Sequence, residues 1–321
     1  MTSLKDKIKE LKPNLKDSSV NLYLTNLKKI YRQIECEGRK EAICNFDNLN
    51  FLNDFDKVME SLADENSNTK KNRLIAIVVS LQASDGDKKL IEKYTKEMID
   101  LANKSNENYR RQEKSQKQKD NWVEYQDLVN LANTMLSRLK KHSILSKDEL
   151  SRAEYNLLQE VVILRFYLSF PLRNDLADVK VIDSKEKDDK TNNFLLLDGD
   201  NISLLLNDYK TAKTFGAQEY KIDKKFSKII RIFLKHNTSG FFITKTNRTE
   251  AITPNGITKL LNRLFQRELN KNISTSMIRH ITASHDRRND KTLAQIEELK
   301  RKVEKRFLHS DSTNHLYRKI D

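Results

Sequence analysis

Apolar residues recur at helical spacing in three stretches of the first hundred positions. The three stretches are residues 14–31, 68–82 and 88–102. Ser18 or Ser19 is expected to cap the first helix, because a hydroxyl at a helix start can accept a hydrogen bond from a free backbone N–H. The alternating pattern of a long strand does not occur before Ser105. The sequence therefore predicts a small helical domain over residues 1–105.

Residues 106–121 interrupt this pattern. They contain almost no apolar side chains and are rich in Lys, Arg and Gln, including Arg110 and Arg111. Such a composition is typical of a solvated linker or an extended basic arm, and the polar end of a helix has the same composition. We predict a basic linker in which Arg110 and Arg111 are candidate DNA contacts.

A second periodic region begins at Trp122 and extends to residue 321. Helical spacing is found at residues 123–140, 147–170, 174–177, 224–235, 255–270, 276–286 and 292–306. Short apolar runs predict strands at residues 194–197, 203–209 and 218–222, with Lys210, Lys213 and Gly216 near a hairpin turn. The predicted fold class is mainly α: an N-terminal helical domain, then a mostly helical domain with a small antiparallel sheet over residues 122–321.

The charge of the chain indicates what kind of partner it binds. The net charge is +14. Residues 1–121 hold 24 Lys and Arg against 20 Asp and Glu, and the remainder holds 36 against 26. A basic excess favours a polyanion, because each Lys or Arg set against a phosphate releases counterions. We therefore expect a nucleic acid as partner and no membrane, since no apolar run approaches the roughly 18 residues needed to span a bilayer.

Cysteines and simple ligand motifs exclude several classes of site. The two cysteines, Cys36 and Cys44, are too few for a disulfide framework and predict free thiols in a reducing, intracellular setting. The sequence has no CxxC, no HExxH and no GxxxxGK[ST], so it predicts no zinc or nucleotide site and no cofactor.

Four separated segments hold residue types suited to phosphoryl transfer. They are PLRNDL around Arg173, YKTAK with Lys210 and Lys213, SMIRH with Ser276 and Arg279, and LHSDSTNHLY with His309 and Tyr317. A guanidinium can bind a phosphate through two hydrogen bonds, and a phenol can act as a nucleophile.

In this order, the four segments resemble the catalytic boxes of the tyrosine recombinase (integrase) family. Arg173 and Arg279 resemble the family's two arginines, and Lys210 resembles its hairpin lysine. His309 and Tyr317 resemble the histidine and the nucleophile of the last box. The N-terminal helices resemble the family's DNA-grasping domain, so the resemblance covers nearly the whole chain.

The resemblance implies a site-specific recombinase that acts on double-stranded DNA, joins Tyr317 to a 3′-phosphate and needs neither metal nor ATP. The two arginines would stabilise the charge on the phosphate, and Lys210 would protonate the 5′-oxygen. Lys213, close by on the hairpin, could take that role instead. The resemblance also implies four protomers on two synapsed DNA sites, in a mobile element or a virus, with cytoplasm and nucleus not distinguished.

Departures from the family pattern leave two alternatives open. Ser276 stands where the family has a histidine, Leu308 replaces a glycine, and the interval from Arg279 to His309 is long. A type IB topoisomerase-like or telomere-resolving enzyme would use similar residues. A DNA-binding protein without catalysis, on the same scaffold, is the second alternative. Beyond the catalytic boxes, Lys70, Lys71 and Arg73 are candidate phosphate contacts, although a solvated helix face would look the same.

Overall fold

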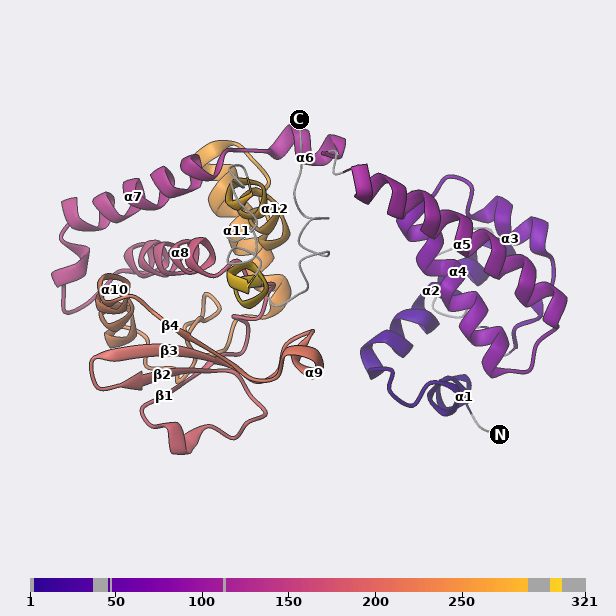
Figure 1. The fold of residues 1–321 in the computed structure, drawn as a ribbon, viewed down its shortest axis with the longest axis horizontal. Helices are drawn as coiled ribbons and strands as arrows, with labels where there is room; N and C mark the ends of the chain where they lie inside the picture. Colours follow the sequence, from indigo (N-terminus) through magenta and orange to yellow (C-terminus); the bar gives the residue numbers. More distant parts are fainter. Residues whose placement is uncertain (1–2, 37–45, 47, 112–113, 288–300, 308–321) are drawn as a thin grey trace. The chain divides into compact units, whose positions relative to one another are not determined.

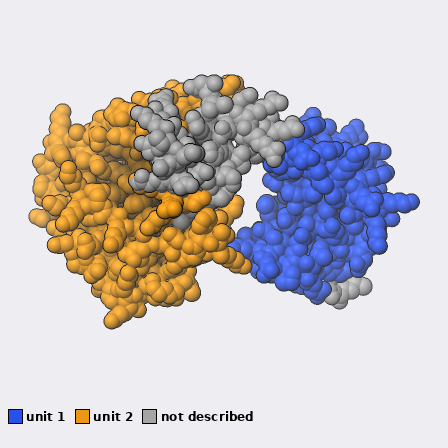
Figure 2. All heavy atoms as spheres, viewed as in Figure 1, with its two compact units in different colours: residues 1–111 blue, residues 112–321 orange. Residues whose placement is uncertain are grey.

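The computed structural model describes residues 3–36, 46, 48–111, 114–287 and 301–307. The chain divides into two compact units, residues 1–111 and residues 112–321 (Figure 2). The division falls inside the stretch that the sequence predicts as a linker.

In unit 1 every element formed by the described residues is a helix (Figure 1). Its elements are α1 (Leu4–Leu11), α2 (Asp17–Glu35), a 3-10 turn (Asn50–Leu52), α3 (Phe55–Ser61), α4 (Ser67–Ala83) and α5 (Lys88–Arg111). α4 packs against α1, α2 and α5, and most of its side chains from Leu74 onward are buried. α4 is thus the central helix of this unit, which confirms the expectation of a helical N-terminal part.

Three details of unit 1 differ from the expectations. Lys16 precedes α2 and makes no side-chain cap, so neither Ser18 nor Ser19 has the predicted role. α5 continues to Arg111, well into the predicted linker. Cys36 is disulfide-bonded, so the expected free thiol is wrong, and the other cysteine, Cys44, lies outside the described residues.

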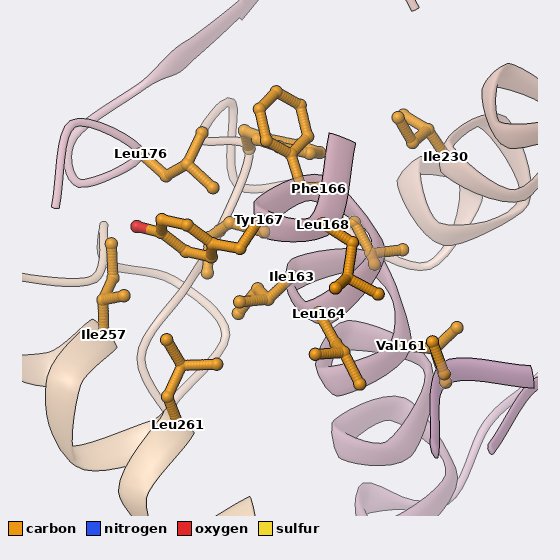
Figure 3. Close-up of a cluster of buried hydrophobic side chains, with 14 of the residues drawn as sticks. Val161, Ile163, Leu164, Phe166, Tyr167, Leu168, Leu176, Ile230, Ile257 and Leu261 are labelled. Atoms are coloured by element: carbon orange, nitrogen blue, oxygen red, sulfur yellow. The ribbon is translucent and has the colours of Figure 1, made fainter. Parts of the chain in front are cut away.

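Unit 2 is built around one buried helix, α8. The helices are α6 (Gln116–Asn121), α7 (Tyr125–Lys141), α8 (Arg152–Ser169), α9 (Ala212–Phe215), α10 (Lys224–Lys235), α11 (Pro254–Leu269) and α12 (Thr275–Asp286). Residues 301–307 are also helical, and short 3-10 turns occur at Ile144–Ser146 and Lys185–Lys187. α8 packs against α7, α10, α11 and α12 and presents apolar side chains on all sides (Figure 3). That all-round burial explains why this segment lacks the one-sided pattern of a surface helix.

The small sheet has the strand order β1-β2-β3-β4. The strands are β1 (Lys180–Ile182), β2 (Phe194–Asp198), β3 (Asn201–Leu206) and β4 (Gln218–Lys221). β2, β3 and β4 pair antiparallel as expected, whereas β1 pairs parallel to β2, so the sheet is mixed. The mainly α class with one small sheet is confirmed, and the predicted hairpin is formed by β3 and β4.

In unit 2, one predicted helix boundary and one predicted helix are wrong. α8 begins at Arg152 and not at 147, because Ser151 and Glu154 form a capping box there. Residues 174–177 form a turn and not a helix, and Asp178 after them has a positive φ of 58°. The predicted helix over residues 292–306 is confirmed only for its described part, residues 301–306.

The connector between the units is also ordered where it is described. Residues 116–121, expected in a linker, form α6, which Ser115 caps. Lys271 donates a hydrogen bond to the Asp120 carbonyl at 2.7 Å, and the Asn272 amide donates to Asn121 Oδ1 at 2.6 Å. α6 is therefore attached to the loop that leads into α12. Among the described residues, no helix is long and apolar enough to cross a membrane.

Candidate active site

Arg173 lies in the loop that follows α8. Pro171 sets the end of this helix, because the residue before a proline disfavours helical geometry and Phe170 is extended. The Arg173 amide donates to Asp175 Oδ2 at 3.0 Å, and the Tyr167 hydroxyl donates to the Arg173 carbonyl at 2.9 Å. Both backbone polar groups of Arg173 are therefore held by side chains, while its own side chain is half-buried.

Asp175 is the electrostatic centre of the site. Burial raises the pKa of its carboxyl, and the positive charges of Arg173 and Arg279 act in the opposite direction. The charge of Asp208, next to the predicted hairpin lysine, raises the pKa further. Arg173, Arg279 and the end of β3 are thus all within electrostatic range of one carboxylate, although they are far apart in the sequence.

Asn174 connects the Arg173 loop to two helices. Its Oδ1 accepts a hydrogen bond from the Thr275 hydroxyl at 2.8 Å, and its Nδ2 donates to Thr258 Oγ1 at 3.2 Å. Thr275 is the first residue of α12, and Thr258 is in the first turns of α11. These two bonds fix the Arg173 loop against the helix that carries Arg279.

Arg279 is buried in α12, with 2% of its surface exposed. Its Nη2 lies 3.5 Å from the Phe307 carbonyl oxygen, and its guanidinium lies 5.9 Å from the centre of the Phe307 ring. A buried cation must be compensated by acceptors or by opposite charge, and Asp175 supplies such charge. Phe307 precedes Leu308-His309 in the chain, so the second arginine lies against the helical residues that lead to the last segment.

The β3–β4 connection carries the candidate lysines. Lys210 and Lys213 are both exposed, and Lys213 lies in the short helix α9. Tyr209 is buried, and burial together with the charge of Asp175 raises the pKa of its phenol. The residue before Lys210 is therefore within electrostatic range of the carboxylate that Arg173 and Arg279 also face. At the other end of the hairpin, the Tyr220 hydroxyl donates to the Lys305 carbonyl at 2.6 Å.

The remaining predicted catalytic residues have different outcomes. Ser276 is exposed in the first turn of α12, directly after the residue that bonds Asn174. His309 and Tyr317 lie outside the described residues. No metal-binding group of three or more His, Cys, Asp or Glu side chains occurs in the part of the chain that the structure describes.

The predicted DNA contacts of unit 1 differ in how far their side chains are exposed. Lys70 and Lys71 are half-buried near the start of α4. Arg73 is buried, pairs with Glu65 and donates to Gln33 Oε1 at 2.5 Å, so its guanidinium is used inside the unit. We therefore do not retain Arg73 as a DNA contact. Arg110 and Arg111 are in α5, and their side chains lie outside the described residues.

Sequence reasoning overlooked the groups that connect the site, namely Asn174, Asp175 and Thr275. Asn174 and Asp175 were visible as polar residues directly after Arg173, and Thr275 directly precedes Ser276. Their spacing gives no sign of the contact between them, because Asn174 and Thr275 are 101 positions apart.

Comparisons with known proteins give a similarity to solved structures. No protein-family model matches the chain, and no curated protein matches it at the sequence level. Among solved structures, the chain is similar to one described as "Crystal structure of XerA recombinase", at 10% identity and a TM-score of 0.38. The alignment covers 100% of this chain and 94% of that one.

Proposed function

We propose that this chain is a site-specific DNA recombinase or integrase that cuts and rejoins DNA through a phosphotyrosyl intermediate. The observation that supports it best is a set of contacts that join the Arg173 loop to α12, and α12 and the lysine hairpin to the helical residues 301–307. Asn174 bonds Thr275, Arg279 contacts Phe307, and Tyr220 of the lysine hairpin bonds Lys305.

The chemistry follows from the groups that would meet at one phosphodiester. Tyr317 Oη attacks phosphorus, a bond forms between them, and the bond from phosphorus to the 5′-oxygen breaks. Arg173 and Arg279 donate hydrogen bonds to the non-bridging oxygens, whose charge grows in the transition state. Lys210 gives a proton to the leaving 5′-oxygen, and His309 donates to a non-bridging oxygen or assists the proton transfer from Tyr317.

Asp175 has a supporting role in this proposal. Two guanidinium groups that face one phosphate repel each other. The carboxylate of Asp175 interacts with the charges of both arginines and so offsets that repulsion. Asp175 also holds the Arg173 amide, so it would fix the position of the first arginine before DNA binds. Ser276, exposed beside them, could donate a hydrogen bond to a phosphate but could not act as an imidazole acid or base.

DNA is the partner in this proposal, and recombination would use four protomers on two synapsed duplexes inside the cell. Lys213, Lys70 and Lys71 would contact the backbone, with Arg110 and Arg111 as further candidates. Binding of this kind weakens steeply with salt, because it depends on counterion release. A mobile element or a virus is the setting in which we expect such an enzyme.

A covalent-capture assay tests the proposal. Nicked duplexes tiled across the DNA that flanks the gene in its source genome are incubated with the protein, without metal or ATP, and resolved on denaturing gels. We expect a protein–DNA adduct from the wild type and none from Tyr317→Phe. Tight, salt-sensitive binding with no adduct on any duplex would contradict the proposal and favour a non-catalytic DNA-binding protein.

The product separates recombination from the related activities. An adduct followed by joining of two DNA molecules indicates a recombinase. Relaxed circles without joining would indicate a topoisomerase-like enzyme, and hairpin ends would indicate a telomere-resolving one.

A further inference from the structure

The position of Lys210 presents a structural problem. Lys210 is exposed in the β3–β4 connection, and the β2–β3 ladder stops where Phe194 pairs with Leu205. A long, charged side chain on an unpaired loop would sample many positions, and a proton donor must be within hydrogen-bond reach of its acceptor. Some other group has to fix the backbone that carries it.

The side chain of Asn193 replaces the missing ladder. Asn193 Oδ1 accepts hydrogen bonds from the amides of Asn207 and Asp208, both at 2.9 Å, and its Nδ2 donates to the Asp208 carbonyl at 2.8 Å. These three bonds satisfy successive backbone groups of the chain as it leaves β3. Two residues later the chain reaches Lys210.

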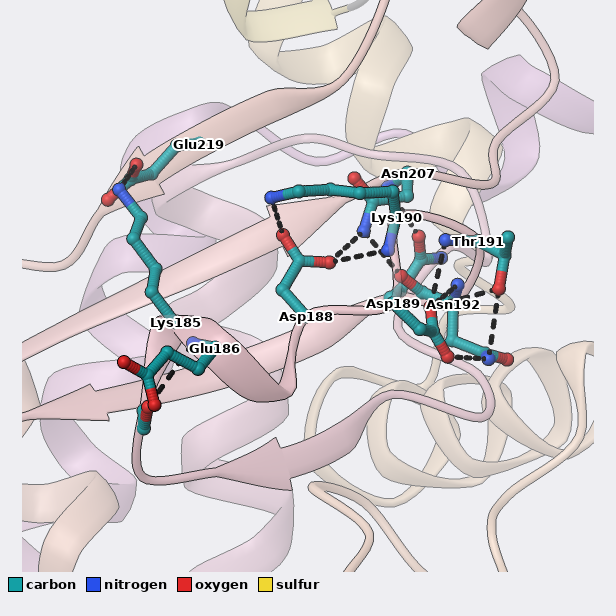
Figure 4. Close-up of polar contacts among 11 residues, drawn as sticks. Lys185, Glu186, Asp188, Asp189, Lys190, Thr191, Asn192, Asn207 and Glu219 are labelled. Atoms are coloured by element: carbon teal, nitrogen blue, oxygen red, sulfur yellow. Dashed lines mark hydrogen bonds and ion pairs between the residues drawn. The ribbon is translucent and has the colours of Figure 1, made fainter.

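The loop that precedes Asn193 is also held by hydrogen bonds. Asn207 Nδ2 donates to Asp188 Oδ1 at 2.8 Å and to the Asn192 carbonyl at 2.7 Å (Figure 4). Asp189 folds its own loop, because its Oδ1 accepts from the amides of Thr191 and Asn192, both at 2.8 Å. Asn193 therefore extends from a loop that is itself held in place by hydrogen bonds.

The loop beyond Lys210 is closed by one further bond. The hydroxyl of buried Tyr209 donates to the Gly216 carbonyl at 2.6 Å, across the base of the connection. Gly216 has a φ of 67°, a conformation that glycine adopts without strain. The backbone around Lys210 is thus fixed at Asn207, Asp208 and Gly216, while the Lys210 side chain stays exposed.

We propose that Asn193 is a positioning residue for general-acid catalysis, because its amide fixes the backbone from which Lys210 reaches the leaving 5′-oxygen. The inference rests on the proposed function and deepens it. An amide is required, because only Asn can accept two amide protons and donate one of its own in this geometry. Asp at this position would keep the two accepted bonds and lose the donor to the Asp208 carbonyl.

The test uses a substrate that needs no general acid. In a duplex with sulfur in place of the bridging 5′-oxygen, the phosphorus–sulfur bond breaks to release a thiolate, which is stable without a proton because thiols are far more acidic than alcohols. A variant that has lost only proton donation should therefore recover on this duplex. A variant whose fold is damaged should not.

The structure offers a matched control in Asn247. Its Oδ1 also accepts from two amides, those of Thr249 at 3.2 Å and Glu250 at 3.3 Å, and its Nδ2 donates to Glu250 Oε1 at 2.8 Å. It lies in a different loop, outside the β3–β4 connection. Asn247→Ala thus removes the same number of bonds, two accepted from backbone amides and one donated, without touching the support of Lys210.

We expect Asn193→Ala to form adduct at least about tenfold more slowly than wild type on the ordinary duplex, with Lys210→Ala slower still, since general acids contribute roughly 10²–10⁴-fold. Both should return to near the wild-type rate on the sulfur duplex, Asn193→Asp should be intermediate, and Asn247→Ala should match wild type on both. Hydrogen exchange should rise in peptides covering residues 207–217 of Asn193→Ala.

Three results would overturn the inference while leaving the proposed function in place. They are equal slowing of Asn193→Ala on both duplexes, a normal rate on the ordinary duplex, and failure of the sulfur duplex to rescue Lys210→Ala. Absence of any wild-type adduct on both duplexes would instead overturn the proposed function, and the inference with it.

Discussion

The Thr275 hydroxyl donates a hydrogen bond to Asn174 Oδ1 at 2.8 Å, and this bond joins the first residue of α12 to the residue after Arg173. This contact between side chains therefore links the loop of one candidate arginine to the helix of the other. Thr275 is 6% exposed, so water cannot replace its hydroxyl freely.

Thr275→Val removes this bond while keeping the shape of the side chain. We expect a loss of about 1–3 kcal/mol in the free energy of unfolding, because Asn174 Oδ1 loses a donor. Adduct formation should fall by a larger factor than DNA affinity, because the two arginines lose their common support. Thr282→Val is the control, since Thr282 is buried in the same helix and its hydroxyl bonds the Ile278 carbonyl within that helix. Equal effects of the two variants on adduct formation would contradict the coupling.

Arg173→Lys and Arg279→Lys keep the positive charge and lose the planar fork. We expect each to lower the rate of adduct formation by roughly 10²–10³-fold, the usual effect of removing one preorganised donor. DNA binding, measured by fluorescence anisotropy, should change little. Arg231→Lys is the control, because Arg231 contacts the carbonyls of Gly199 and Asn201 in the β2–β3 turn. Wild-type rates from both site variants would remove the arginines from the mechanism.

Asp175 should make stability depend on pH in an unusual direction. Burial raises the pKa of its carboxyl in the folded protein, so the folded state binds the proton more tightly than the unfolded state. Its contribution to stability is then present below the ordinary carboxyl pKa and is lost as the pH rises through the raised value. The free energy of unfolding of wild type, minus that of Asp175→Asn, should fall over this interval and then level off.

Glu154 provides the opposite case in the same experiment. A hydrogen bond from Lys147 and the capping contacts with Ser151 lower its pKa to about 2. The free energy of unfolding of wild type, minus that of Glu154→Gln, should therefore be positive at neutral pH and shrink as the pH falls toward that value. Urea unfolding from pH 3 to pH 7 measures both differences. The same sign of slope for the two variants would contradict the assignment of Asp175.

Arg73 and its lysine neighbours should separate stability from DNA binding. Arg73→Ala leaves Glu65 partly buried without its cation, and breaking such a pair costs roughly 3–5 kcal/mol. Hydrogen exchange in peptides from α4 should therefore rise markedly. Unchanged exchange would show that the ion pair does not support the unit.

Lys70→Ala combined with Lys71→Ala should leave exchange in α4 nearly unchanged and weaken DNA binding. We expect the slope of log affinity against log salt to become shallower by up to about 2, because roughly one counterion is released for each phosphate that a lysine neutralises. A slope equal to that of wild type would assign these two lysines to a solvated face.

Local patterns predicted much of the fold, and long-range contacts account for the rest. Apolar spacing located α2, α4, α7 and α10 to within a few residues, because one buried face leaves a period in the sequence. The short elements α1, α3 and β1 were missed, since three to eight residues carry little periodic signal. The failed helix at residues 174–177 shows a stronger effect: Asn174 makes tertiary bonds to Thr275 and Thr258, and the Asp175 side chain bonds the Arg173 amide in a local turn.

The candidate site follows the same division. Arg173, Lys210, Ser276 and Arg279 could be proposed because each lies in a short motif, and the structure joins the Arg173 loop to the start of α12. Asn174, Thr275 and Asn193 could not, because each is an ordinary polar residue whose partner is distant in the sequence or defined only by the fold. The burial of Arg73 was equally invisible, since an exposed and a buried arginine look the same in a helical pattern.

The attachment of α6 to the loop before α12 has a consequence for dissecting the protein. Lys271 and Asn272, which lie shortly before Thr275 in the chain, bond Asp120 and Asn121. A fragment cut at Trp122, where the sequence places the boundary, would discard α6 and leave these bonding groups facing water. A fragment that starts at residue 112 would retain them. The shortest fragment of unit 2 that keeps these bonds therefore includes a helix whose polar sequence resembles a linker.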